Sequence, residues 1–170
     1  LPLTYVTSFW VNNRELFLEQ IIFKIKTSDG FLIISMAQDV TERKHLEEIR
    51  ELRLRLMDYS ANHSLENLLV NTLDEIENIT GSKIGFYHFV NDDQNHITLQ
   101  AWSTATSNYF CDIKGMHGYH YPIDEAGIWA DCVRKKEPVI HNDYMSEKLR
   151  KGLPEGHAEL TRELVVPVIR

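Results

Sequence analysis

The chain has 170 residues, of which 43% are hydrophobic, and a formal net charge of -7. This length and composition provide for at least one packed core, in one ordinary domain or in parts of two. The net negative charge offers no cationic field to a phosphate backbone, so we expect no nucleic acid partner. The longest apolar stretches, 31–34 and 164–169, are far shorter than the roughly 20 residues that cross a bilayer, so we expect no membrane span in this segment.

Two cysteines, Cys111 and Cys132, lie far apart in the sequence. They form no Cys-x-x-Cys motif, which argues against a disulfide framework and a zinc knuckle and favours a reducing, cytoplasmic environment. The chain begins Leu-Pro-Leu-Thr, without an initiator Met or the basic and apolar regions of a secretory signal. We therefore expect the natural N-terminus to lie upstream.

The beginning of the chain predicts a β-hairpin followed by a helix. Residues 16–26 and 31–36 are rich in β-branched and aromatic side chains, and Ser28-Asp29-Gly30 between them favours a turn. From Thr41 the composition changes to strong helix formers without Gly or Pro, which predicts a helix over 42–59. Apolar residues of this helix recur at a and d heptad spacing, which predicts parallel self-association into a homodimer. They are Ile49, Leu52, Leu56 and Tyr59.

The rest of the chain alternates helical and β-rich segments. Polar cap candidates at 62–64 precede an apolar pattern of helical spacing over 65–79, which Gly81 ends. Two β-rich runs, 84–90 and 96–102, flank a turn-forming cluster and predict a second hairpin. Further elements are expected in this order: a strand at 119–123, a helix at 125–136 capped by Asp124, a strand at 138–141, a polar loop at 142–162 and a buried strand at 164–169.

The helix start carries a recognisable motif. Asp39-Val40-Thr41-Glu42-Arg43-Lys44, which follows the first hairpin, resembles the C-terminal end of a PAS domain. In that family the Asp and Thr start the exit helix, which agrees with Thr41 acting as a cap. The resemblance implies that residues 1–44 are the C-terminal part of a PAS domain and that residues 45–62 are a helical signalling linker.

Residues 63–170 resemble a GAF domain that is incomplete at its C-terminus. The similarity rests on Ile-Gly-Phe-Tyr-His-Phe-Val, Gln-Ala-Trp-Ser-Thr, His-Tyr-Pro-Ile-Asp-Glu-Ala-Gly-Ile-Trp, Pro-Val-Ile-His-Asn-Asp-Tyr and Arg-Glu-Leu-Val-Val-Pro-Val. These segments are similar to GAF domains of archaeal and bacterial multi-domain sensor histidine kinases. The resemblance implies an α+β fold with an antiparallel sheet, a small-molecule ligand held between sheet and lid, and a downstream histidine kinase domain.

The same resemblance points to a cofactor. Some GAF domains of methanogen sensor kinases bind haem through a cysteine thioether and a histidine, and this sequence is similar to them. Cys111 and His157 are the matching residues, with His157 as the iron ligand. Other expected lining residues of that cavity are Trp102, Tyr119, His120 and Tyr144. Against this, a single Cys is more often an inert small hydrophobe, and a loop His is more often solvated.

Other functions are weighed against the haem hypothesis. Bilin-binding GAF domains have a His directly after the attachment Cys, and neither cysteine here is followed by one. His45 and His63 lack the Glu-x-x-x-Pro that follows the phosphoacceptor of a kinase dimerisation box. Core packing is the favoured role for Trp129, at apolar helical spacing with Val133. With no nucleophile–base pair, phosphate loop or metal motif, we expect a sensory binding segment and no enzyme. The alternative is a ligand-free GAF domain for dimerisation and spacing.

Overall fold

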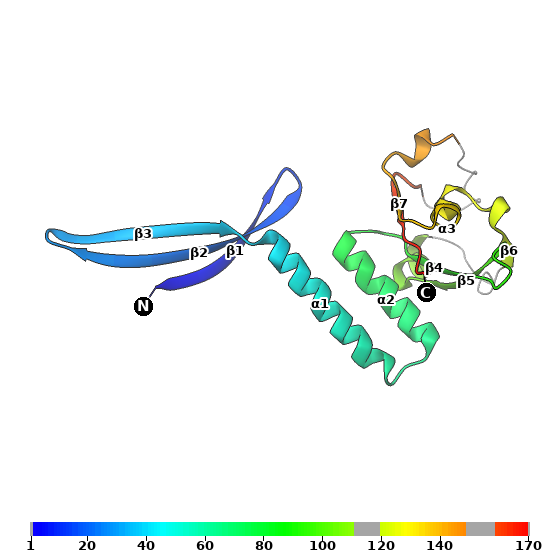
Figure 1. The fold of residues 1–170 in the computed structure, drawn as a ribbon, viewed down its shortest axis with the longest axis horizontal. Coiled ribbons are helices and arrows are strands. Elements are labelled where there is room, and N and C mark those ends of the chain that lie inside the picture. The colour runs from blue at the N-terminus through cyan, green and yellow to red at the C-terminus, as the bar shows by residue number, and fades with distance from the viewer. Residues whose placement is uncertain (1, 111–119, 149–158, 170) are drawn as a thin grey trace. The chain divides into compact units, whose positions relative to one another are not determined.

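The structure is a computed structural model that describes residues 2–110, 120–148 and 159–169. The chain divides into two compact units, Leu1–Asp58 and Tyr59–Arg170 (Figure 1). None of the helices in the described ranges combines the length and the apolar character that crossing a bilayer requires.

The first unit contains a three-stranded antiparallel sheet of order β1-β2-β3. Its strands are β1 (Leu3–Val11), β2 (Arg14–Thr27) and β3 (Gly30–Asp39). The hairpin of β2 and β3 was predicted, but β1 is an additional strand. Asn12 and Asn13 connect β1 to β2 with φ angles of 50° and 61°. Positive φ at both central residues of a two-residue loop suits the twist of a hairpin, and Asn tolerates it.

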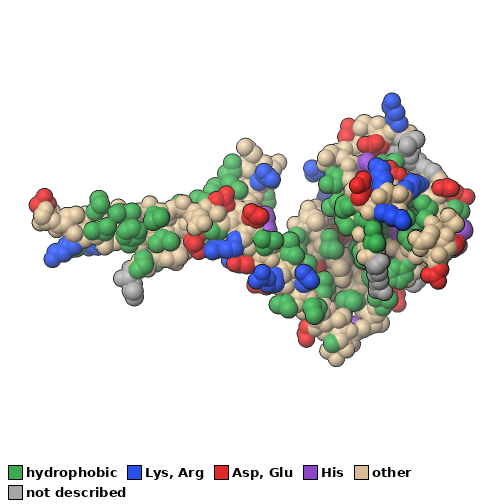
Figure 2. Space-filling view, in the orientation of Figure 1, with side chains coloured by type: hydrophobic (Ala, Val, Ile, Leu, Met, Phe, Trp, Pro, Cys, Tyr) green, Lys and Arg blue, Asp and Glu red, His purple; other side chains and the backbone are tan. Residues whose placement is uncertain are grey.

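This sheet exposes much of its apolar surface, as the hydrophobic side chains over β2 and β3 in Figure 2 indicate. Phe31, Leu32 and Ile33 follow one another on β3 and are all exposed. Successive residues of a strand point to opposite faces, so both faces of β3 present apolar side chains. Among the described residues of this unit only Val40 and Leu52 are buried.

Helix α1 (Thr41–Ser60) begins where the motif predicted. The Thr41 amide donates to Asp39 Oδ1 at 2.9 Å, and hydrogen bonding from the Thr41 side chain and amide lowers the pKa of the Asp39 carboxyl. Thr41 Oγ1 in turn accepts from the Phe17 amide at 2.9 Å. The sequence assigned the capping role to Thr41, whereas Asp39 supplies the capping oxygen and the Thr41 hydroxyl joins the helix start to β2.

Helix α2 (Leu65–Thr80) is the first element of the second unit's core, and it has the predicted N-terminal cap and C-terminal glycine. Ser64 Oγ accepts from the Asn67 amide at 3.3 Å, which satisfies a helix N-terminal donor. Gly81 ends the helix in the left-handed conformation at φ 66°, as glycine readily does. Leu69 and Leu73 of α2 pack against Ala101.

The second unit's main sheet has the order β4-β5-β6 and is antiparallel. Its strands are β4 (Phe86–Val90), β5 (His96–Trp102) and β6 (His120–Pro122). The ladder pairs Phe86 with Trp102 and Tyr87 with Ala101, then shifts so that His88 pairs with Leu99. Gln100 is therefore an extra residue in β5, and the ladder contains a bulge there.

The bulge decides which side chains share a face. Paired residues of an antiparallel ladder point to the same side. Tyr87 and Ala101 face α2, whereas Phe86 and Trp102 face the opposite side. Strict alternation along β5 would have placed Trp102 on the face of Thr98.

The face away from α2 is partly covered by short helical turns. They are η2 (Ile123–Glu125), η3 (Ile128–Ala130) and α3 (Asp131–Lys135). The core there contains Ile97, Ile123, Ala126 and Ala130, with Val90, Trp129 and Val133 packed against it. Core packing of Trp129 is thus confirmed, although Trp129 lies in η3 and not in an α-helix.

The predicted helix over 125–136 was wrong in extent, since the α-helical part is α3 alone. Arg134 explains part of the difference. Its Nη2 donates to the Ile123 carbonyl at 2.7 Å and to the Ala126 carbonyl at 3.3 Å. A side chain therefore takes up carbonyls that a continuous helix would have bonded internally.

The last strands, β7 (Val139–His141) and β8 (Glu163–Val165), form a separate two-stranded antiparallel ladder. A 3-10 turn, η4 (Tyr144–Ser146), follows β7. The mixed helix and antiparallel-sheet composition agrees with the predicted α+β class. The predicted strand at 164–169 is shorter, ending before Pro167, which cannot donate to a ladder.

Candidate ligand-binding site

An aromatic cluster lies on the side of the β4-β5-β6 sheet away from α2. Phe86 is at its centre, with ring centroids 5.3 Å from His88, 6.1 Å from Trp102 and 5.5 Å from Trp129, all edge to face. His88 stacks on Trp129 at 4.7 Å and an interplanar angle of 27°. We call Phe86, His88, Trp102 and Trp129 the aromatic face.

The aromatic face is uncharged at neutral pH. Burial among apolar rings lowers the pKa of His88 to about 4, because the imidazolium form would lose its hydration. Trp102 Nε1 is buried and has no hydrogen-bond acceptor among the described residues. A surface of this kind can stack against a flat apolar molecule and offer it one indole N–H donor.

Phe86 and His88 were not among the site residues predicted from the sequence. The signal was present, since residues i and i+2 of a strand share a face, and Phe86 and His88 stand in that relation on β4. Trp102 was predicted as a lining residue, but its position on the same face as Phe86 could not be predicted from alternation, because the bulge at Gln100 changes the alternation of β5.

Of the predicted lining residues, the structure describes Trp102, His120 and Tyr144, and these do not share one surface. Trp102 belongs to the aromatic face. His120 pairs with Thr98 in the ladder and therefore points to the other side of the sheet. There its ring stacks on His96 at 4.7 Å, and its Nδ1 lies 2.9 Å from Asn91 Nδ2.

The other predicted residues lie elsewhere or outside the described ranges. Tyr144 is 3% exposed and begins η4, where its amide donates to the Thr161 carbonyl at 2.9 Å. Cys111, Tyr119 and His157 lie outside the residues that the structure describes. The predicted pairing of Cys111 with His157 remains a prediction.

The described cysteine, Cys132, is buried in α3. Burial raises the pKa of its thiol, with the nearby carboxylates of Asp131 and Glu163 acting in the same direction. A raised pKa disfavours the thiolate, which is the nucleophilic form. Cys132 is therefore poorly suited to covalent attachment of a ligand.

A largely buried hydrogen bond between a His and a Glu side chain joins β7 to β8. His141 Nδ1 lies 2.7 Å from Glu163 Oε1, and the two residues are partners in the ladder. Their side chains are 11% and 9% exposed. Burial raises the pKa of Glu163, while the hydrogen bond from His141 opposes that shift. This pair holds the small ladder together.

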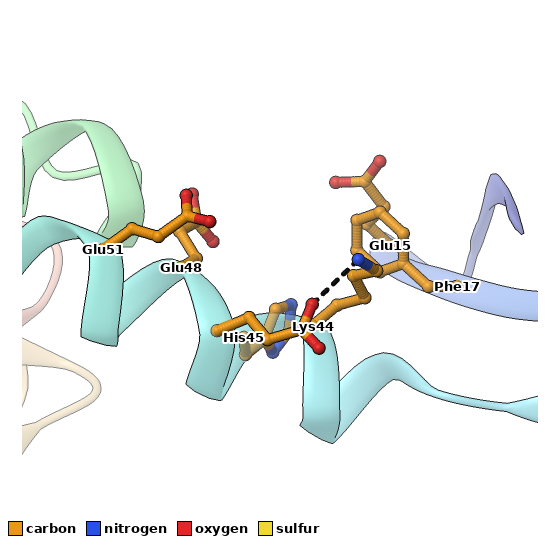
Figure 3. A pocket seen from close by; sticks show the side chains of 7 residues that line it. Glu15, Phe17, Lys44, His45, Glu48 and Glu51 are labelled. Carbon is orange, nitrogen blue, oxygen red and sulfur yellow. Dashed lines mark hydrogen bonds and ion pairs between the residues drawn. The ribbon is translucent and has the colours of Figure 1, made fainter.

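A shallow hollow of about 280 Å³ lies on the first unit, between β2 and the start of α1 (Figure 3). Its lining is mostly acidic, and Lys44 Nζ bonds Glu47 Oε2 at 2.8 Å within it. The lining residues are Glu15, Phe17, Lys44, His45, Glu47, Glu48 and Glu51.

Within the described residues, no group of three or more His, Cys, Asp or Glu side chains could hold a metal ion. The aromatic face is thus the better candidate for a small apolar ligand.

Comparison with known proteins agrees with this architecture. The GAF domain family matches residues 62–170. Among curated proteins, the methyl sulfide methyltransferase-associated sensor of Methanosarcina acetivorans is 32% identical to this chain over 143 residues. The match covers 80% of this chain and 14% of the relative, so the chain spans only a small part of the relative's length. No solved structure matches the chain significantly. Since the family match covers more than half of its residues, the chain belongs to the GAF domain family.

Proposed function

We propose that this chain is the sensory ligand-binding segment of a cytoplasmic, multi-domain sensor histidine kinase, and that the aromatic face is the ligand side of its GAF domain. The observation that carries the proposal is the half-buried, uncharged cluster of Phe86, His88, Trp102 and Trp129 on the sheet face away from α2. In this proposal residues 1–44 are the end of a PAS domain and residues 45–62 the linker helix. The chain binds a ligand and passes the change on, without catalysing a reaction.

Haem is the proposed ligand. The flat, aromatic and uncharged character of the face fits a large planar macrocycle, and a neutral His88 adds no charge against it. Cys111 would attach the group and His157 would bind its iron, as in the similar GAF domains. When bound, haem would supply redox and gas-binding chemistry. The chain's own residues would stack on the ring and exclude water.

Absorbance spectroscopy tests this proposal directly. Purified full chain reconstituted with haemin should give a Soret band that shifts in His157→Ala. Acid extraction should release the haem from Cys111→Ala but leave it attached to the unchanged protein. Matched controls are Cys132→Ala, which removes the buried thiol, and His120→Ala on the opposite sheet face. A protein without a Soret band, or equal effects of His157→Ala and His120→Ala, would refute the haem proposal.

The rival function is a ligand-free GAF domain that serves dimerisation and spacing. It is favoured by the apolar side chains that α1 exposes, which suit self-association of the linker helix. These residues are Leu46, Ile49, Leu54 and Met57. The absorbance experiment separates the two functions, because the rival predicts a dimer that takes up no haemin.

A further inference from the structure

A buried polar network joins α2 to the end of β5. Ser103 Oγ donates to Glu77 Oε1 at 2.5 Å and lies 2.7 Å from Thr106 Oγ1. Since the Ser103 hydroxyl proton is directed to the carboxylate, the Thr106 hydroxyl donates to Ser103. Ser103 and Thr106 are both 0% exposed, and Glu77 is 8% exposed. Glu77 is therefore a buried carboxylate whose described hydrogen-bond partner is the segment after β5.

A second carboxylate of α2 bonds the same segment. Asp74 Oδ1 accepts from the Thr104 amide and Asp74 Oδ2 accepts from the Thr104 hydroxyl, each at 2.7 Å. Asp74 and Glu77 are three positions apart on α2, which places both carboxylates on one side of the helix. We call Asp74, Glu77, Ser103, Thr104 and Thr106 the latch.

The latch also fixes the edge of the aromatic face. The Gly85 amide donates to Thr106 Oγ1 at 3.0 Å, and the Ser103 amide donates to the Gly85 carbonyl at 2.9 Å. Gly85 directly precedes Phe86, and Ser103 directly follows Trp102. The latch thus bonds the residue before Phe86 and includes the residue after Trp102. The two rings themselves lie on the side of the sheet away from α2.

We propose that the latch is a coupling element, through which a change at the aromatic face alters the stability of α2. A displacement of the Phe86–Trp102 pair moves Gly85 and Ser103, whose hydrogen bonds lead to Glu77. A buried network of this kind is stable when every member is satisfied and costly when one bond is lost, so its response is close to all-or-none. The inference rests on the proposed function, since it assumes that the aromatic face is where the ligand acts.

A double-mutant cycle in the ligand-free full chain tests the coupling. Trp102→Phe perturbs the aromatic face, and Glu77→Gln removes the latch charge while keeping an acceptor. The readout is amide hydrogen exchange of α2 from Asp74 to Thr80. We expect Trp102→Phe to change the opening equilibrium of these amides severalfold, and we expect this effect to disappear in the Glu77→Gln background.

Independent sites would give effects that multiply within about twofold, whereas coupled sites should deviate by more than about threefold. Glu66→Gln is the matched control, because it removes the same charge from the exposed first turn of α2. Its background should leave the effect of Trp102→Phe unchanged. If Glu77→Gln does not fold, Thr104→Ala removes a latch hydroxyl from an exposed residue and completes the same cycle.

Two results would overturn the proposal. One is an effect of Trp102→Phe on α2 amide exchange that is the same with and without Glu77→Gln. The other is a Glu66→Gln variant that changes this effect as much as Glu77→Gln does. The cycle uses no ligand, so its outcome is separate from that of the haemin titration. A protein that takes up no haemin would refute the haem proposal, and the cycle would still decide the role of the latch.

Discussion

Protonation of His88 should make the stability of the second unit depend on pH. The pKa of His88 is lowered from 6.5 to about 4 by burial. Between these two values the unfolded chain binds a proton that the folded chain does not, so stability is fully present above about pH 6.5 and falls as the pH falls. The linkage relation gives a loss of about 2 kcal/mol between pH 7 and pH 5, and of about 3 kcal/mol by pH 4.

Urea unfolding across this pH range measures the effect. His88→Phe keeps an aromatic ring on the aromatic face and removes the titrating group, so its unfolding free energy should fall less on acidification than that of the unchanged protein. The difference between the two curves cancels the other titrating groups. Leu73→Ala is the control, because it disturbs the core on the α2 side of the sheet without removing a proton site or a ring that packs on His88. Its curve should run parallel to that of the unchanged protein.

Two results would refute the reasoning. One is a plot of unfolding free energy against pH for His88→Phe that runs parallel to that of the unchanged protein. This would mean that His88 has the same pKa in the folded and the unfolded chain. The other is an imidazole resonance of His88 that titrates near pH 6.5 in the folded chain. Either would show that the aromatic face is open to water, and the proposed stacking surface for a flat apolar ligand would lose its basis.

The remaining predictions concern packing, the hydrogen-bonded pair of His141 and Glu163, and assembly. Gly85→Ala should destabilise the second unit by about 1–3 kcal/mol in urea unfolding, because an added Cβ would lie 3.0 Å from a latch carboxylate oxygen; an unchanged midpoint would contradict this. His141→Ala should cost about 1–3 kcal/mol, since it leaves the buried carboxylate of Glu163 without its partner, and His141→Gln, which retains a donor, should recover part of the loss. Double replacement of the exposed Leu46 and Met57 by Glu should dissociate dimers in sedimentation experiments, and a monomeric unchanged protein would refute self-association through α1.

The choice of residues for that last experiment differs from what the sequence suggested. Heptad spacing selected Leu52 and Leu56, but Leu52 is 7% exposed within the single chain. Charged replacement of Leu52 would therefore test folding as much as assembly. A heptad pattern identifies an apolar stripe, and only the tertiary structure shows which part of it stays accessible.

Local signals determined much of the fold. The start of α1 near Thr41, the Ser64 cap and Gly81 end of α2, and the extent of β5 were all predicted from neighbouring residues. Each depends on interactions within a few positions, such as a cap hydrogen bond or a left-handed glycine. The GAF resemblance was also visible in the sequence, because several segments along the chain are similar to segments of GAF domains.

The candidate site depended on contacts between distant residues. The bulge at Gln100 moved Trp102 to the face of Phe86 and His88, while His120 points to the other side. The latch joins two residues of α2 that are about five-sixths of a turn apart to a segment 26 to 30 positions further along the chain. Composition and periodicity report which residues favour a helix or a strand. The partners of a buried carboxylate, and the face on which a ring lies after a bulge, are set by strand register and helix packing, and these form only when the chain has folded.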